Sequence, residues 1–153
     1  MGGGLPLSGL VGRSEIMDLA LPGELSSTHS CNPISCVAGN TVIQIMETIS
    51  FKNKISENSL LFSELGNILK NKFYFLKRKS NFIGMVGALV FEFENNEKSI
   101  EVANKFCEIA LKKSVLVIKT GRESVKLSPP LLINKETIQR AFEIMDSILK
   151  KIN

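Results

Sequence analysis

The sequence is poor in the residues that build metal centres and disulfide frameworks. It has three cysteines, Cys31, Cys36 and Cys107, which form no Cys-x-x-Cys pair, and one histidine, His29. An odd, scattered set of thiols makes a poor disulfide framework and a poor zinc site. We therefore expect no metal site, and we expect the thiols to be buried or half-buried.

Long apolar runs are also missing. No stretch approaches the roughly 18 apolar residues of a membrane-spanning helix. The first residues lack the basic flank and the long apolar segment of a signal peptide. These absences favour a cytoplasmic protein with no membrane partner. With 153 residues, of which 44% are hydrophobic and 22% charged, the chain is expected to bury a core.

Charge is distributed unevenly along the chain. Residues 1–51 hold one basic and four acidic residues, whereas the remainder holds 18 basic and 11 acidic residues. The densest basic segment also contains aromatic residues, and its cations are Lys70, Lys72, Lys77, Arg78 and Lys79. That combination occurs in nucleic-acid-binding surfaces. Because Phe73 and Leu76 continue an apolar helical stripe, we interpret it as the solvated end of a helix, with no nucleic-acid partner.

The first 50 residues do not contain the elements of a complete domain. Residues 7–13 are short, apolar and interrupted by glycine, which predicts a buried strand, and residues 14–18 predict a brief helical turn. A loop rich in Pro, Gly, Ser and Thr follows. Asn32 and Pro33 then mark the start of a helix that is apolar on most sides. Such a helix is either buried or joins two packed bodies.

Residues 51–153 have the pattern of a small α/β domain. The polar segment 52–59 is the best candidate for a domain boundary. Beyond it, periodicity predicts a helix over 61–76, a strand over 82–93, a helix over 99–113, strands over 114–120 and 124–128, and a last helix capped by Asn134. This order is typical of a short sheet covered by helices on one face.

Three motifs resemble those of class III aminotransferases in order and spacing. They are GGGLPLSGLVGRSEIMD at 2–18, LSSTHSCNPISCVAG at 25–39 and VKLSPPLLI at 125–133. The resemblance covers the whole chain but only the C-terminal part of such an enzyme. It implies that residues 1–50 are the end of a large pyridoxal-phosphate-binding domain with a long linker helix, and that residues 51–153 are the small α/β domain.

The same resemblance implies a reaction. Class III enzymes such as 4-aminobutyrate and acetylornithine aminotransferases are homodimers that use pyridoxal phosphate. They transfer an amino group, often an ω-amino group, from an amino acid or amine donor to a 2-oxo acid acceptor. An aminomutase or a decarboxylase-like relative on the same scaffold is also compatible with the motifs, since the fold does not fix the reaction.

Individual site residues follow from the motifs by resemblance. Thr28 matches a threonine that reaches across the dimer interface to the cofactor phosphate, and a hydroxyl can donate to a phosphate oxygen. Ser27 beside it can add its N–H or its hydroxyl, although both residues also suit an ordinary turn. Lys126 stands where many members have an arginine that grips the substrate carboxylate, and lysine offers a point charge instead of a fork. His29 falls at an aromatic or histidine position, where we expect packing.

Some positions depart from the family pattern. Cys31 replaces a usual glycine before Asn-Pro, and Ile83 precedes Gly84 where a basic residue is common. If the backbone at Cys31 has φ > 0, its Cβ costs about 1 kcal/mol or more. Such departures fit a divergent member or relaxed selection.

The resemblance places the Schiff-base lysine two residues before Met1, and no lysine in the sequence matches it. We therefore expect no catalytic residue in this chain and no activity from the chain alone. The interpretations are a start upstream of Met1, a split gene or a decayed gene. The alternative from a different class is a non-catalytic remnant that serves as an assembly module.

Overall fold

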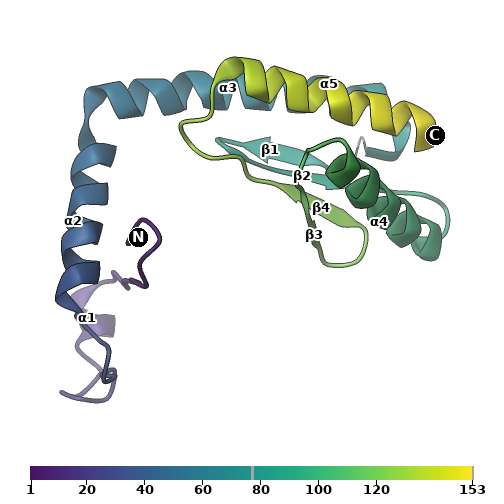
Figure 1. Cartoon of the computed structure of the whole chain (residues 1–153). Helices are drawn as coiled ribbons and strands as arrows, with labels where there is room; N and C mark the ends of the chain where they lie inside the picture. Colours follow the sequence, from purple (N-terminus) through teal and green to yellow (C-terminus); the bar gives the residue numbers. More distant parts are fainter. Residues whose placement is uncertain (77, 153) are drawn as a thin grey trace. The chain divides into compact units, whose positions relative to one another are not determined.

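The computed structural model describes residues 1–76 and 78–152. Contacts divide the chain into two compact units, Met1–Lys52 and Asn53–Asn153, and Figure 1 labels the elements. Lys77, one of the cations of the basic segment, lies outside the described residues. Within the described residues, no helix combines the length and apolar character that crossing a lipid bilayer demands.

Helix α2, Pro33–Glu47, is the main element of the first unit. It begins as the sequence predicts, because the Oδ1 atom of Asn32 accepts two N–H groups of the first turn at 3.0 and 3.3 Å, and Pro33 follows directly. The start of the chain packs on this helix at Gly39. A Cβ at Gly39 would clash with the Cδ2 atom of Leu7, so a larger residue there would require the Leu7 side chain to move.

The buried strand predicted for residues 7–13 is wrong. The segment is irregular, Leu10 and Val11 are 76% and 97% exposed, and helix α1, Ser14–Met17, follows it. A strand needs a neighbour to pair its backbone. The described part of the first unit offers only an isolated bridge between Gly2 and Leu5. Helix α2 is likewise not buried in this chain, since Ile34 is 70% exposed.

Helix α3, Ile49–Lys72, runs through the polar segment that the sequence suggests as a boundary. Residues 52–59 are helical because their polar side chains mostly take the exposed positions, and a helix tolerates polar residues on that face. Asn58 is the exception, because it is fully buried. The division between the two units, after Lys52, falls inside this helix.

The second unit contains a four-stranded antiparallel sheet in the order β1-β2-β4-β3. The strands are β1 (Asn81–Ile83), β2 (Val86–Val90), β3 (Ile118–Thr120) and β4 (Ser124–Leu127). The single strand predicted over 82–93 is therefore a hairpin. It turns at Gly84, whose φ of +58° suits glycine.

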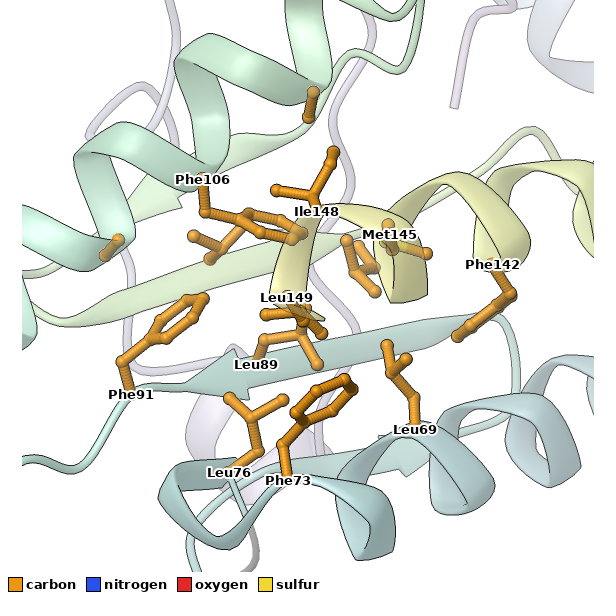
Figure 2. Packing of buried hydrophobic residues seen from close by; sticks show 14 of the residues in the cluster. Leu69, Phe73, Leu76, Leu89, Phe91, Phe106, Phe142, Met145, Ile148 and Leu149 are labelled. Carbon is orange, nitrogen blue, oxygen red and sulfur yellow. The ribbon is translucent and has the colours of Figure 1, made fainter. Parts of the chain in front are cut away.

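Helices cover one face of this sheet and enclose its core. They are residues 53–72 of α3, helix α4 (Asn96–Lys112) and helix α5 (Lys135–Ile152), with a short 3-10 turn, η1 (Tyr74–Leu76), after α3. Figure 2 shows side chains of these elements converging on Leu89 of β2. Phe73 and Phe75 of the basic segment are buried as predicted, whereas its third aromatic residue, Tyr74, is 69% exposed, which corrects the prediction for that residue. The mixed α/β fold with a short sheet is confirmed.

Candidate functional site

The loop before α2 holds two of the three site residues suggested by the sequence. Ser27 closes a small turn with Ser30: its N–H donates to the Ser30 Oγ at 2.9 Å, the two hydroxyls lie 3.0 Å apart, and the Ser30 N–H donates to the Ser27 carbonyl at 3.0 Å. The N–H of Ser27 is thus already used within the turn, and its hydroxyl lies against that of Ser30, where either hydroxyl can be the donor.

Thr28 lies in the middle of that turn and is exposed. Among the described residues, neither its N–H nor its hydroxyl has a hydrogen-bond partner. An exposed hydroxyl of this kind can donate to an oxygen of an incoming phosphate. The chemistry of the turn therefore fits one contact to a phosphate group, but a single hydroxyl does not make a complete phosphate site.

Cys31 joins this turn to the start of α2, and its backbone has a left-handed conformation. Its φ is +56°, so the cost anticipated for a Cβ at this position, where the family usually has glycine, applies. The side chain is exposed, which contradicts the prediction of a buried thiol, whereas Cys36 and Cys107 are half-buried as expected. Burial raises the pKa of the Cys107 thiol, only partly offset by Lys119.

His29 neighbours Thr28 and is exposed, so the packing expected for it is not seen in this chain. The packing was expected from the family position of His29, which is usually aromatic or histidine. Nor do the described residues contain a group of three or more His, Cys, Asp or Glu side chains with the geometry of a metal site.

Lys126, the third suggested residue, lies in the second unit at the middle of β4. It pairs with Ala88 on one side and Ile118 on the other. Its neighbours in the strand, Val125 and Leu127, face the core, so alternation places Lys126 on the uncovered face of the sheet. Its exposed ammonium has no carboxylate within ion-pair distance among the described residues.

Lys126 also contributes to the wall of a cavity of about 680 Å³ in the second unit. The cavity lies among α5, residues 113–118 and residues 126–130, with Phe62 of α3 on its wall. Sequence reasoning missed this cavity and two of its cations, Lys113 and Arg140. No motif could have found them, because the wall combines segments that meet only after folding.

Asn58 was also missed, because it falls in the polar segment 52–59. Its amide Nδ2 donates to the carbonyls of Leu131 at 3.1 Å and Ile133 at 2.8 Å, although 73 and 75 residues separate the partners. Its Oδ1 is buried without a partner among the described residues. A flipped amide would set that oxygen against two carbonyls, so the donor orientation is the stable one. The single sequence signal is an asparagine at an inward-facing helical position.

Comparison with protein families gives a match along nearly the whole chain. The family described as Aminotransferase class-III matches residues 1–149. The chain is 29% identical over 157 aligned positions to a probable 4-aminobutyrate aminotransferase of Bacillus subtilis, covering 96% of this chain and 34% of that protein. It is 27% identical to an alanine/serine racemase of Pyrococcus horikoshii, with coverages of 96% and 31%.

Solved structures give the same fold. The acetylornithine aminotransferase of Elizabethkingia anophelis superposes with a TM-score of 0.75 and 20% identity, over 92% of this chain and 34% of that one. The chain thus spans about a third of the length of the relatives that it matches.

Proposed function

Because this chain belongs to the class III aminotransferase family, we propose that it is the C-terminal part of a pyridoxal-phosphate-dependent aminotransferase. The family match over residues 1–149 carries this proposal. The enzyme would transfer an ω-amino group from an amino acid or amine to a 2-oxo acid. It would act as a cytoplasmic homodimer.

The two proposed domains follow one another along the chain. Residues 1–50 would end the large cofactor-binding domain and supply a linker helix, and residues 51–153 would form the small domain. The compact units Met1–Lys52 and Asn53–Asn153 support a division near this point. The exposed apolar residues of the first unit, such as Leu10 and Val11, support a covering by other parts of the complete enzyme.

Two side chains of this chain would serve the reaction directly. When bound, pyridoxal phosphate supplies the electron sink for amino transfer. Thr28 would donate its exposed hydroxyl to a phosphate oxygen of the cofactor in the neighbouring subunit. Ser27 would join it through its hydroxyl when the Ser30 hydroxyl is the donor of the pair, because the Ser27 N–H already donates to Ser30. Lys126 would hold the substrate carboxylate with its exposed ammonium and so orient the substrate.

The lysine that such chemistry requires is not among these residues. Residues 1–51 contain no lysine, and a lysine amine is needed both to attach the cofactor and to move the proton. We therefore propose that the chain alone is inactive and that upstream polypeptide provides the lysine. The Pyrococcus relative is named a racemase, so the products formed must be identified as well.

The experiment has two steps. First, the DNA upstream of the Met1 codon is read in all frames for an in-frame lysine two positions earlier and a cofactor domain before it. Second, the 153-residue chain and the extended protein are compared for cofactor binding, amino transfer to a 2-oxo acid and racemisation. We expect transfer by the extended protein only. A cofactor that borohydride fixes to a lysine of the 153-residue chain would refute the proposal of inactivity.

A substitution separates the two assigned roles in the extended protein. Lys126→Ala should raise the KM for a carboxylate substrate and leave cofactor affinity nearly unchanged, because its ammonium serves the substrate alone. Lys105→Ala, which removes an exposed lysine of α4, is the matched control. An unchanged KM in Lys126→Ala would remove this residue from the site while leaving the family assignment intact.

A further inference from the structure

The helical stretch from Pro33 to Lys72 is interrupted at a single residue. Helix α2 ends at Glu47 and helix α3 begins at Ile49, so only Thr48 between them is not helical. The φ of Thr48, −64°, suits a helix, whereas its ψ of 143° is extended. The break therefore differs from a continuous helix mainly in one torsion angle of one residue.

Neither the backbone composition nor the packing around this residue accounts for the break. Sharp interruptions of a helix are usually caused by proline, by glycine, or by a side chain that inserts into the hydrogen-bond ladder. Residues 40–65 contain neither proline nor glycine. Residues 43–50 are all exposed, so no buried contact within the described chain bends it here. The remaining cause is the side chain of Thr48 itself.

The Thr48 hydroxyl caps both helices. It donates to the carbonyl of Ile45 in the last turn of α2 at 2.8 Å, and it accepts the N–H of Phe51 in the first turn of α3 at 3.3 Å. The Ser50 hydroxyl also donates to it at 3.3 Å. The first main-chain bond of α3 runs from the Lys52 N–H to the Thr48 carbonyl at 3.1 Å. One side chain thus satisfies groups at two helix ends that would otherwise be left to water.

The alternative arrangement of the same residues is one continuous helix. In that helix the N–H groups of Ile49 and Ser50 would pair with the carbonyls four residues earlier, those of Ile45 and Met46. Exposed main-chain pairs contribute little each to stability, a capping hydroxyl contributes a similar amount, and threonine is a weak helix former. The two arrangements are therefore close in free energy, and the hydroxyl decides between them.

We propose that Thr48 is a switchable joint between two helices. With its hydroxyl bonded, α2 and α3 are separate; without those bonds, residues 33–72 form one helix. The joint lies within about one turn of Lys52, where the first compact unit ends, and α3 continues into the second unit. A change of state at Thr48 therefore redirects the chain between the units without disturbing buried side chains. The proposal depends on neither pyridoxal phosphate nor amino transfer.

The test uses NMR spectroscopy of the 153-residue chain. The ¹³Cα shift of residue 48, taken relative to the random-coil value of its residue type, is negative in an extended segment and positive in a helix. Amide hydrogen exchange of Ile49 and Ser50 is the second measurement, because these N–H groups are bonded only in the continuous helix. In the parent we expect an extended shift at Thr48 and fast exchange at both amides.

Variants separate the hydroxyl from the shape of the side chain. Thr48→Ala removes the hydroxyl and favours a helix, so it should shift the equilibrium toward the continuous helix about tenfold or more and slow exchange at Ile49 and Ser50. Thr48→Val keeps the shape and should shift it in the same direction, whereas Thr48→Ser keeps the hydroxyl and should resemble the parent. Thr41→Ala is the matched control, because it removes a hydroxyl that donates to the Val37 carbonyl at 3.0 Å inside α2.

Three outcomes would overturn the proposal. An extended residue 48 with fast exchange at Ile49 and Ser50 in both Thr48→Ala and Thr48→Val would show that the hydroxyl does not hold the break. Equal behaviour of Thr48→Ser and Thr48→Ala would show the same. A helical shift at Thr48 in the parent would remove the break itself, and none of these results would bear on amino transfer by the extended enzyme.

Discussion

Removing the side-chain amide of Asn58 should lower the free energy of unfolding of the second unit substantially. The side chain is fully buried and makes two hydrogen bonds, at 3.1 and 2.8 Å, to the carbonyls of Leu131 and Ile133. Asn58→Leu keeps the approximate volume and removes both donors. Each lost bond costs about 1 kcal/mol net, and a carbonyl left buried adds about 1–3 kcal/mol. Leu131 is 40% exposed and Ile133 is half-buried, so neither carbonyl bears the full penalty.

The expected loss for Asn58→Leu is therefore about 2–4 kcal/mol in the free energy of unfolding. The variant also lacks the buried, unpartnered Oδ1 of Asn58, and losing that unfavourable group offsets part of the destabilisation. Urea denaturation followed by circular dichroism measures the change. Asn67→Leu replaces an exposed asparagine of the same helix and should stay within about 0.5 kcal/mol of the parent.

Asn58→Asp tests the hydrogen bonds rather than the packing. The introduced carboxylate would face two carbonyls in a buried place, so its folded-state pKa should lie above the usual value near 3.9. A raised folded pKa gives stability that is present at low pH and lost as pH rises through the folded pKa. The deficit relative to the parent should therefore grow from pH 3 to pH 7, to about 4 kcal/mol or more. The same deficit at both pH values, or one matched by Asn67→Asp, would refute the reasoning.

Three further predictions concern the turn, an ion pair and the N-terminal segment. In the extended enzyme, Thr28→Val should weaken cofactor affinity about tenfold to a hundredfold by removing one charge-assisted hydrogen bond; parent-like affinity by equilibrium dialysis would leave Thr28 a turn residue. Burial raises the pKa of Asp146, but hydrogen bonds from Lys150 and Lys72 outweigh burial, so the folded-state pKa is lowered. The stabilisation that these ion pairs give is therefore present above the unfolded pKa and is lost as pH falls through the folded pKa. Asp146→Asn should thus cost up to about 1 kcal/mol at pH 7 and nothing near pH 2 in urea denaturation, since the lysines are largely exposed. Limited proteolysis should cut first before Asn32, and hydrogen exchange should protect β2 but not Leu7–Arg13; equal protection of both would contradict this.

Local chemistry in the sequence was enough to place the starts of α2 and α5, but not the start of α3, which begins at Ile49, before the polar segment 52–59 that was interpreted as a boundary. Asn32 and Asn134 each cap the helix that follows, and the apolar stripe from Ile138 to Leu149 lies in the core. These features depend on residues within a few positions of one another. For the same reason the sequence motifs were sufficient to suggest the family, which the match over residues 1–149 shows.

Strand pairing and burial were decided only by the tertiary structure. The alternating pattern of 82–93 suits one strand or two, and pairing through the turn at Gly84 selected the hairpin. Residues 7–13 have strand composition but no neighbour to pair with in the described chain. Pattern alone cannot supply the partner of a strand, because the partner can lie anywhere in the sequence.

The candidate sites divide in the same way. Ser27, Thr28 and Lys126 were found from motifs, and the structure added that Ser27 is engaged in its turn while Thr28 is not. The cavity and the Asn58 contacts were invisible in the sequence. Asn58 reaches carbonyls 73 and 75 residues away, and the cavity wall joins α3, residues 113–118 and α5. Helix caps are short-range interactions that the sequence fixes, whereas cavities and buried polar contacts arise only when distant segments pack.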